Sequence, residues 1–303
     1  MDKTVNFTII IPHKNIPNLL ERLIKSVPER DDLEIIVVDD GSSPDIVDFE
    51  HFPCKERKNL RLVLNKESHG AGHARNSALP LARGKWILFA DSDDFFNPGF
   101  NDFLDDYADS DADIVYFSAN SVDTDTLKPS NRVDHLHDFI DEYQNNPENG
   151  ELVMRYLFTE PWCKMVKRRL IESNGILFEE TCIRNDVRYS YLVGHYAQKV
   201  IVDDRQLYCV TTRQDSVSRG AGRQATLDEL MVFAGWKHFL MSHGIALPLP
   251  KFDLCLYQFT RNLWKDDQLF RTEYELLRKA GLSRGYIAGQ VLKYIRKSLA
   301  YKL

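Results

Sequence analysis

Residues 84–98 read Gly-Lys-Trp-Ile-Leu-Phe-Ala-Asp-Ser-Asp-Asp-Phe-Phe-Asn-Pro. The five apolar residues 86–90 have the length and composition of a buried strand. Asp91, Asp93 and Asp94 follow at once, which places three carboxylates at the carboxyl edge of a sheet, where open α/β folds bind ligands. Oxygen ligands without neighbouring Cys or His suit Mg²⁺ or Mn²⁺, completed by substrate phosphates. Taken alone, the pattern is more typical of a solvated turn after a strand.

The composition is that of a globular protein that buries a core. Of 303 residues, 43% are hydrophobic and 28% charged, and the net charge of −6 gives no general case for nucleic acid as a partner. Five scattered cysteines without CxxC spacing predict a reducing, cytoplasmic compartment and no zinc site. The polar first six residues predict no signal peptide, and no apolar run approaches the roughly 18 residues of a membrane span.

The amino-terminal third alternates strands and helices. Apolar runs predict buried strands at residues 7–11, 33–38, 60–64 and 86–90. Helical spacing predicts helices at residues 16–27 and 70–82. This alternation is typical of a parallel sheet with helical crossovers. Three of the strands end in polar residues, so we expect these residues to line one ligand crevice.

Four motifs in this third resemble those of family 2 glycosyltransferases, in the same order and at similar spacing. They are residues 9–15 (Ile-Ile-Ile-Pro-His-Lys-Asn), 36–42 (Ile-Val-Val-Asp-Asp-Gly-Ser), 70–76 (Gly-Ala-Gly-His-Ala-Arg-Asn) and 89–94 (Phe-Ala-Asp-Ser-Asp-Asp). The last contains a segment that resembles the Asp-x-Asp motif of the GT-A type. The resemblance implies a GT-A domain over residues 1–220, a mostly parallel twisted sheet between helices, with a helical appendage over residues 221–303.

The resemblance further implies a nucleotide-sugar donor, with UDP as the expected nucleotide, and a Mn²⁺ or Mg²⁺ ion held by Asp93 and Asp91 with Asp94 assisting. The implied donor-binding residues are Pro12, His13, Lys14, Asp40, Gly70, Arg75, Asn76, Asp91 and Ser92. Gly70 and Gly72 permit close backbone approach but form neither a GxGxxG nor a Walker pattern. Two alternatives stay open: Asp39 supports the turn rather than the ligand, and Arg75 pairs with an aspartate rather than with phosphate.

The implied acceptor side lies in the second half of the chain. Residues 161–164 resemble the Pro-Trp-x-Lys segment of the family, in which Trp162 offers a face for a sugar ring and Lys164 contacts phosphate or holds a loop. The family usually has Glu-Asp where this chain has Asn185-Asp186, so the resemblance implies Asp186 as the general base and Asn185 as a changed acceptor residue. Arg213 and Arg219 are candidates for a loop that closes over the diphosphate.

The remaining segments carry weaker patterns. Residues 101–150 are acidic and predict one strand at 113–118, while the rest of this segment is expected to be a surface excursion or part of the acceptor wall. Two short strands are expected at 199–202 and 207–210. Beyond residue 222 every predicted element is a helix. These helices cover residues 226–243, opened by a Thr-Leu-Asp-Glu capping box, and residues 252–264, 270–280 and 283–300.

The function implied by the resemblance is metal-dependent, inverting transfer of a sugar to a hydroxyl of a glycan or lipid-linked glycan, in bacterial cell-surface polysaccharide synthesis. A sugar nucleotidyltransferase should instead have a Gly-rich basic loop after the first strand, which this chain lacks. A non-catalytic nucleotide-sugar binder stays open because of Asn185. The last helix has basic residues and a broad apolar face, which predicts contact with the inner face of the cell membrane, docking on its own domain, or a homodimer.

Overall fold

The computed structural model describes residues 4–213, 222–247, 259 and 265–300. It divides into two compact units. The first contains residues 1–180 and 188–216, and the second contains residues 181–187 and 217–303. The predicted boundary at residue 220 stays a prediction.

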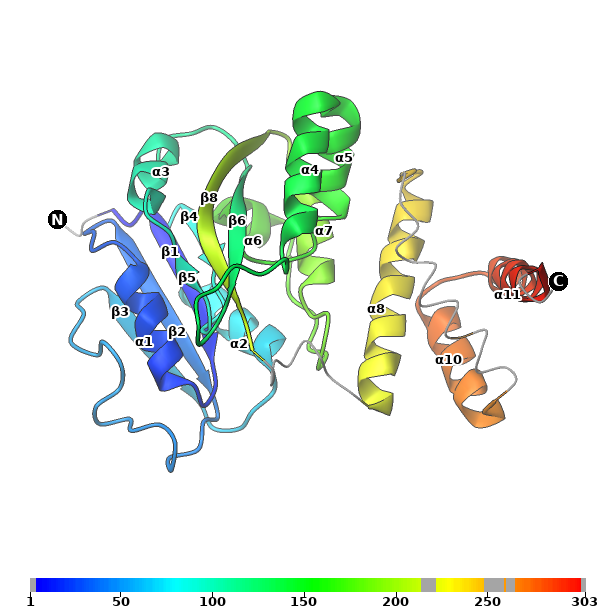
Figure 1. The fold of residues 1–303 in the computed structure, drawn as a ribbon, viewed down its shortest axis with the longest axis horizontal. Helices are drawn as coiled ribbons and strands as arrows, with labels where there is room; N and C mark the ends of the chain where they lie inside the picture. The colour runs from blue at the N-terminus through cyan, green and yellow to red at the C-terminus, as the bar shows by residue number, and fades with distance from the viewer. Residues whose placement is uncertain (1–3, 214–221, 248–258, 260–264, 301–303) are drawn as a thin grey trace. The chain divides into compact units, whose positions relative to one another are not determined.

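The first unit is built on one mixed sheet. Within the described residues this sheet has eight strands in the order β3-β2-β1-β4-β7-β6-β8-β5 (Figure 1). The strands are β1 (Phe7–His13), β2 (Leu33–Asp40), β3 (Leu60–Asn65), β4 (Trp86–Phe89), β5 (Phe95–Phe96), β6 (Ile114–Asp123), β7 (Lys164–Lys167) and β8 (Val200–Thr212). Four of the neighbouring pairs are parallel, namely β1–β2, β1–β4, β2–β3 and β6–β8, and the other three are antiparallel. The predicted α/β architecture is therefore confirmed.

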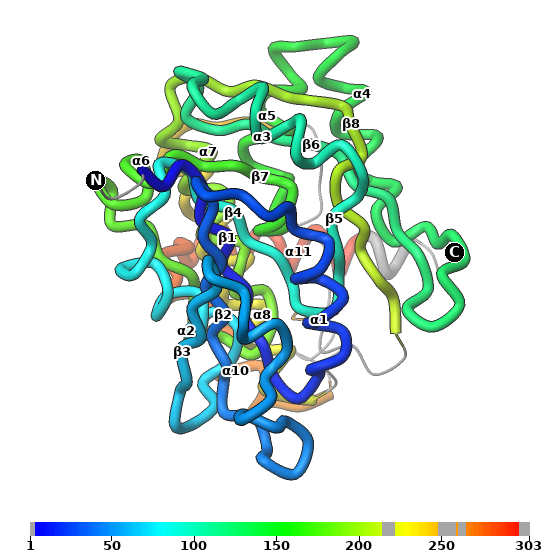
Figure 2. The backbone as a smooth tube through the Cα atoms, turned by 90° about the vertical axis from the view of Figure 1, so that its left-hand side faces the viewer, coloured from blue at the N-terminus to red at the C-terminus, as the bar shows by residue number. Residues whose placement is uncertain are grey.

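Helices cover both faces of this sheet. They are α1 (Pro17–Ser26), α2 (Ala71–Ala78), the 3₁₀ turn Leu79–Leu81, α3 (Phe100–Tyr107), α4 (Asp134–Asn145), α5 (Pro147–Tyr156), α6 (Arg168–Ser173) and α7 (Val187–Tyr196). The chain crosses from β1 to β2 in one direction and from β3 to β4 in the other, so right-handed crossovers require α1 and α2 on opposite faces. Figure 2 shows these two helices on either side of β1 and β2.

The directions of the strands place the ends of β1, β2, β4 and β6 and the start of β7 at one edge of the sheet. The carboxyl ends of β1, β2 and β4 coincide there because these strands are parallel. β7 is antiparallel to β4, so the residues just before β7 lie at the same edge. β6 is antiparallel to β7 and therefore ends there too. We call this the carboxyl edge.

Two strand predictions were incomplete. The strand predicted at 113–118 is confirmed as the first part of β6, which continues to Asp123, pairs with both β7 and β8 and is almost fully buried. Polar residues such as Ser118 and Ser121 interrupt its apolar pattern, which hid its full length. The two short strands predicted at 199–202 and 207–210 are one strand of 13 residues, β8, with register irregularities opposite residues 116–119.

The described part of the second unit contains the helices α8 (Arg223–Ser242), α10 (Asp267–Lys279) and α11 (Arg284–Ala300). The predicted capping box is wrong: α8 begins three residues earlier, and the Thr226 hydroxyl donates to the Gly222 carbonyl from inside the helix. The cap that does form is Asp266, which accepts from the Leu269 N–H at the start of α10. The predicted helix at 252–264 lies outside the described residues. Where the chain is described, no helix is long and apolar enough to cross a membrane.

Candidate active site

The end of β1 is fixed to the end of β2 through His13 and Asp39. The Ile16 N–H donates to His13 Nε2 (3.3 Å), so the ring proton is on Nδ1, which donates to Asp39 (2.8 Å). The Ser42 N–H and hydroxyl donate to the same carboxylate at 2.9 and 2.6 Å. Burial raises the pKa of Asp39, but these hydrogen bonds outweigh it and the net pKa is lowered. The expectation that Asp39 supports the turn is confirmed, and His13 is buried beside it.

Asp40 holds the loop that leads into α2. It accepts hydrogen bonds from the Ser68 hydroxyl (2.7 Å) and from the N–H groups of His69 (3.1 Å) and Gly70 (2.8 Å). Burial raises its pKa, and these donors lower it by more. The neighbouring Gly41 has φ 69°, and a Cβ there would lie 3.0 Å from the Ser68 nitrogen, so this close approach of two loops requires glycine.

The three aspartates after β4 form a tight turn at the carboxyl edge. The Asp94 N–H donates to the Asp91 carbonyl (3.0 Å), and the chain then enters β5, which pairs with β8. Tyr208 of β8 is hydrogen-bonded to both ends of the turn, because its hydroxyl accepts from the Asp91 N–H (2.9 Å) and bonds to the Asp94 carboxylate. Asp94 also accepts from the Thr211 N–H (2.7 Å) and is buried, which leaves Asp91 and Asp93 as the more exposed carboxylates.

Three arginines surround this turn. Arg75 of α2 donates to Asp91 (2.6 Å) and lies 5.2 Å from the centre of the Phe178 ring. Arg213 is 3.3 Å from Asp93, and Arg22 of α1 donates to the Asp93 carbonyl (2.5 Å). The contact of Arg75 is the aspartate pairing that the sequence left open. Arg219 lies outside the described residues.

The carboxylates of the turn repel one another. Burial raises the pKa of Asp93, the charge of Asp91 raises it further, and Arg213 only partly offsets them. Burial and the charges of Asp93 and Asp91 likewise raise the pKa of Asp94 well above its usual range. A divalent cation would relieve this repulsion, and two carboxylates at a sheet edge are a donor set that suits Mg²⁺ or Mn²⁺. No group of three or more His, Cys, Asp or Glu side chains suited to a metal occurs in the described residues, so phosphate oxygens would have to complete the ligand shell.

The predicted acceptor residues before β7 are buried. The Trp162 ring stacks on the Tyr208 ring, with centroids 5.6 Å apart and planes 17° apart. The Lys164 ammonium is buried and donates to the carbonyls of Phe158 (2.7 Å) and Glu160 and to the Ser190 hydroxyl (3.1 Å). Lys164 therefore holds the loop that precedes β7, and a contact of either residue with the acceptor stays a prediction.

The other predicted donor residues differ in exposure and in hydrogen bonding. Lys14 is exposed at the carboxyl edge and donates to the Ser68 hydroxyl (2.8 Å). Asn76 is occupied with the backbone of Phe178, to which it donates at 3.0 Å and from which it accepts at 2.9 Å. Pro12 and Ser92 are buried.

Asn185 and Asp186 belong to the second unit, directly before α7. Their segment is attached to α8 at two points: the Cys182 N–H donates to Asp228 (2.9 Å), and Arg184 pairs with Glu229 (3.0 Å). The predicted catalytic role of Asp186 stays a prediction.

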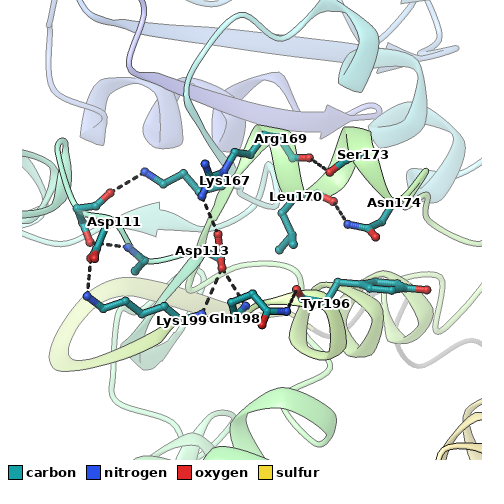
Figure 3. A network of polar contacts seen from close by, with 12 residues as sticks. Asp111, Asp113, Lys167, Arg169, Leu170, Ser173, Asn174, Tyr196, Gln198 and Lys199 are labelled. Carbon is teal, nitrogen blue, oxygen red and sulfur yellow. Dashed lines mark hydrogen bonds and ion pairs between the residues drawn. The ribbon is translucent and has the colours of Figure 1, made fainter.

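A separate cavity of about 480 Å³ lies in the first unit, lined by Asp113, Arg169, Leu170, Glu172, Ser173, Tyr196 and Gln198. Asp113 directly precedes β6, so this cavity is at the edge opposite the aspartate turn. Figure 3 shows Asp113 accepting from the N–H groups of Gln198 (2.9 Å) and Lys199 (3.2 Å) and from Arg169 (3.2 Å). These bonds join strand ends and offer no catalytic group.

Comparison with known proteins identifies the family. Residues 8–175 match Glycosyl transferase family 2, and the chain belongs to that family. It is 27% identical to glycosyltransferase GlyA of Streptococcus pneumoniae over 70% of this chain and 31% of GlyA. It is 26% identical to the poly(ribitol-phosphate) beta-N-acetylglucosaminyltransferase TarS of Staphylococcus aureus, over 69% of this chain and 36% of TarS. The chain thus spans about a third of the length of these two relatives.

Solved structures agree on the fold. The structure of S. aureus TarS 1-349 in complex with UDP-GlcNAc has a TM-score of 0.69 at 19% identity, over 98% of this chain and 92% of that one. The mannosyltransferase PcManGT of Pyrobaculum calidifontis, in complex with GDP-Man and Mn²⁺, has a TM-score of 0.51 at 17% identity, over 98% of this chain and 81% of that one. The fold of this chain is therefore the GT-A fold with a helical carboxyl-terminal region.

Proposed function

We propose that this protein transfers a sugar from a nucleoside-diphosphate donor to a hydroxyl group of a glycan acceptor. The observation that carries the proposal is the turn of Asp91, Asp93 and Asp94 at the carboxyl edge, beside the loops that His13, Asp39 and Asp40 hold in place. A diphosphate with a bound cation is the partner that mutually repelling carboxylates and nearby arginines favour.

The donor we propose is a UDP-sugar, which agrees with the UDP-GlcNAc named for the TarS structure. Lys14 and the loop over residues 68–70 face the nucleotide in this proposal, and Arg75 contacts the donor beside Asp91. Asp40 already accepts four hydrogen bonds, from Asn65, Ser68, His69 and Gly70, which is about what a carboxylate can accept. We therefore assign Asp40 to shaping this loop.

The metal we propose is Mn²⁺ or Mg²⁺, held by Asp93 and Asp91. When bound, it supplies positive charge that stabilises the diphosphate leaving group. Asp94 contributes by fixing the turn, since its carboxylate is taken up by Thr211 and Tyr208.

Transfer in this proposal is an inverting single displacement. Asp186 accepts the proton of the acceptor hydroxyl as the hydroxyl oxygen attacks the anomeric carbon of the donor sugar. The bond between this carbon and the diphosphate oxygen breaks at the same time. Asn185 next to it can donate or accept a hydrogen bond but cannot take a proton. The GT-A domain over residues 1–220 would bind the donor, and the helical region over 221–303 would hold the segment of Asp186 through Asp228 and Glu229.

The acceptor we propose is a cell-surface glycan or its lipid-linked precursor, handled in the cytoplasm at the inner face of the membrane. The name of the relative TarS, which acts on poly(ribitol-phosphate), supports a cell-surface polymer. Contact of α11 with the membrane and a homodimer remain parts of this proposal.

One screen tests the proposed reaction. Release of nucleotide is measured from a panel of UDP-, GDP- and dTDP-sugars with Mn²⁺, with and without added EDTA. We expect slow release from one UDP-sugar, with water as the acceptor, that EDTA abolishes. Tight binding of a UDP-sugar without any release would instead favour the second candidate, a non-catalytic binder, which Asn185 in place of glutamate keeps open.

A further inference from the structure

A histidine–carboxylate pair in the first unit is not used by the proposed mechanism. His135, in the first turn of α4, lies with Nε2 3.0 Å from the Glu160 carboxylate. A carboxylate can only accept, so Nε2 carries a proton and donates to Glu160. The ring packs edge-on against Phe139, with centroids 5.6 Å apart and planes at 83°. His135 Nδ1 has no hydrogen-bond partner among the described residues, and the side chain is 30% exposed.

The backbone of Glu160 is held in place by two hydrogen bonds. The Glu160 carbonyl accepts from the buried Lys164 ammonium and from the Ser190 hydroxyl (3.3 Å). Burial raises the pKa of Glu160, but the His135 imidazole and the Lys164 ammonium lower it by more, so the group is ionised at neutral pH. Two elements, β7 and α7, thus fix Glu160, and Glu160 fixes the ring of His135.

The pair lies on the same edge as the aspartate turn. Glu160 is four residues before β7, whose start is at the carboxyl edge. Two contacts connect the His135–Glu160 pair with the aspartate turn: Trp162, two residues after Glu160, stacks on Tyr208, and the Tyr208 hydroxyl accepts from the Asp91 N–H. On the other side, His137 bonds the Ala119 carbonyl of β6 (2.9 Å), and the adjacent Asn120 accepts from Asn97, three residues after the turn (2.7 Å).

We propose that His135, oriented by Glu160, binds a hydroxyl group of the acceptor sugar through Nδ1. The inference rests on the proposed function and deepens it, because it names a residue that selects the acceptor. A hydroxyl is the group that fits, since it can donate to Nδ1 of the neutral ring or accept from it when the ring is doubly protonated.

The test separates water from sugar as the acceptor. Release of UDP from the UDP-sugar found in the screen is measured alone and with a panel of methyl hexosides and methyl N-acetylhexosaminides. His135→Ala should raise the KM for the methyl glycoside about tenfold, the usual worth of one hydrogen bond to a neutral group. It should leave kcat and the hydrolysis rate without sugar within about twofold, because water needs no such contact.

Two amide variants show which nitrogen matters. In His135→Asn the amide occupies the position of Nδ1 and should restore part of the lost affinity. In His135→Gln the amide reaches the position of Nε2 and Glu160 and should restore none. Rescue by Gln and not by Asn would show that the ring only braces α4, and would overturn the proposal. His51→Ala is the matched control, because it removes the ring of an exposed His–Asp pair (2.8 Å to Asp48) and should change nothing.

The outcomes also separate this inference from the proposed function. Unchanged KM for the glycoside in His135→Ala, or hydrolysis that falls in parallel with transfer, overturns the role of His135 while donor turnover stands. If the wild-type protein turns over no nucleotide sugar, the proposed function is wrong and the role of His135 in it is wrong as well.

Discussion

Asp93 has a half-buried carboxylate with the Asp91 carboxylate as its neighbour, and burial and this neighbour both raise its pKa. The Arg213 guanidinium lies 3.3 Å from the Asp93 carboxylate and offsets part of its negative charge. In a site that binds a diphosphate, the remaining negative charge would favour binding of a divalent cation, because both the aspartates and the phosphates attract it. The same charges that reduce the stability of the free protein would thus favour binding of the proposed donor with its metal.

The first prediction concerns this charge. Asp93→Ala should abolish transfer and should also remove the rise in Tm that Mn²⁺ causes in the wild-type protein. Saturating ligand at about 100 times its Kd stabilises by about 2.7 kcal/mol, which is readily seen in a thermal melt. Asp203→Ala is the control, because Asp203 is paired with Arg205 away from the turn (2.6 Å) and should keep the Mn²⁺ effect. Full activity of the wild type in EDTA would contradict the metal assignment.

The second prediction concerns the proposed base. Asp186→Asn should lower kcat by about 10² to 10⁴, the usual worth of a positioned general base, with donor affinity almost unchanged. Single-turnover transfer and UDP titration measure the two quantities separately. Loss of UDP binding at an unchanged rate per bound donor would assign Asp186 to the donor instead.

Residues of the candidate site could be predicted from the sequence where a local motif contains them. Asp91, Asp93 and Arg75 lie in local motifs. Tyr208 and Thr211 were missed, because they act through a strand pairing about 117 positions away and their own segment looks like any buried strand. The pairing of His135 with Glu160 likewise joins two segments whose contact no local pattern predicts.

At the level of secondary structure, the apolar pattern of each strand explains which strand boundaries could be predicted from the sequence and which could not. β4 is apolar throughout, and β1 and β2 contain apolar runs at residues 9–11 and 35–38, so these strands are visible in the sequence. β1 and β2 each continue two residues beyond the predicted end and finish in a buried polar residue. β6 is as buried as they are, yet its second half satisfies polar side chains internally, as when the Ser121 hydroxyl donates to the Ser130 carbonyl (2.8 Å). Tertiary pairing, which a local pattern does not encode, decides such cases.

A third prediction belongs to the start of β6. Burial raises the pKa of Asp113, but the N–H groups of Gln198 and Lys199 and the charge of Arg169 lower it by more (Figure 3). A lowered pKa in the folded state stabilises the fold above the ordinary carboxyl pKa of about 3.9, and this is lost as the pH falls through the folded pKa. Asp113→Asn should therefore cost about 1–3 kcal/mol at pH 7 and progressively less below pH 4, measured by urea denaturation. Asp111→Asn, at an exposed neighbour, should change little.

A fourth prediction belongs to α8, which holds the segment of Asp186. Asp228 accepts from the Cys182 N–H (2.9 Å) and from Gln224 (2.7 Å) and is buried. Asp228→Ala should loosen that segment and lower kcat about tenfold or more, without changing donor affinity. Its control is Glu275→Ala on α10, an exposed carboxylate. Equal loss of donor affinity in Asp228→Ala would show a general unfolding instead.

At the scale of the whole molecule, the chain consists of two compact units. The first has the sheet and the carboxyl-edge residues, and the second has Asp186 and the helices α8, α10 and α11. The GT-A half could be predicted because its motifs are concentrated in the first hundred residues. The helical half could be predicted only as helices, since amphipathic spacing identifies a buried face without identifying its partner.

The last prediction tests what α11 does. Ile287 and Tyr294 of α11 are 2% and 5% exposed, so this helix buries part of its apolar face in the free protein, and Leu282 just before it is 1% exposed. Burial of each such side chain is worth about 1.5–3 kcal/mol, so a chain cut after Gly281 should lose stability and should bind a dye for exposed apolar surface.

Membrane contact is therefore better tested by charge than by truncation. Arg284, Lys293 and Arg296 are exposed, as is the intervening Leu292, so Glu at the three basic positions should leave the fold intact. If α11 contacts the membrane, the wild type should sediment with anionic vesicles at low salt, since each basic residue near the surface contributes about 1 kcal/mol, and the triple variant should not. Equal sedimentation of the two proteins, or none by either, would show that α11 serves only to complete the second unit.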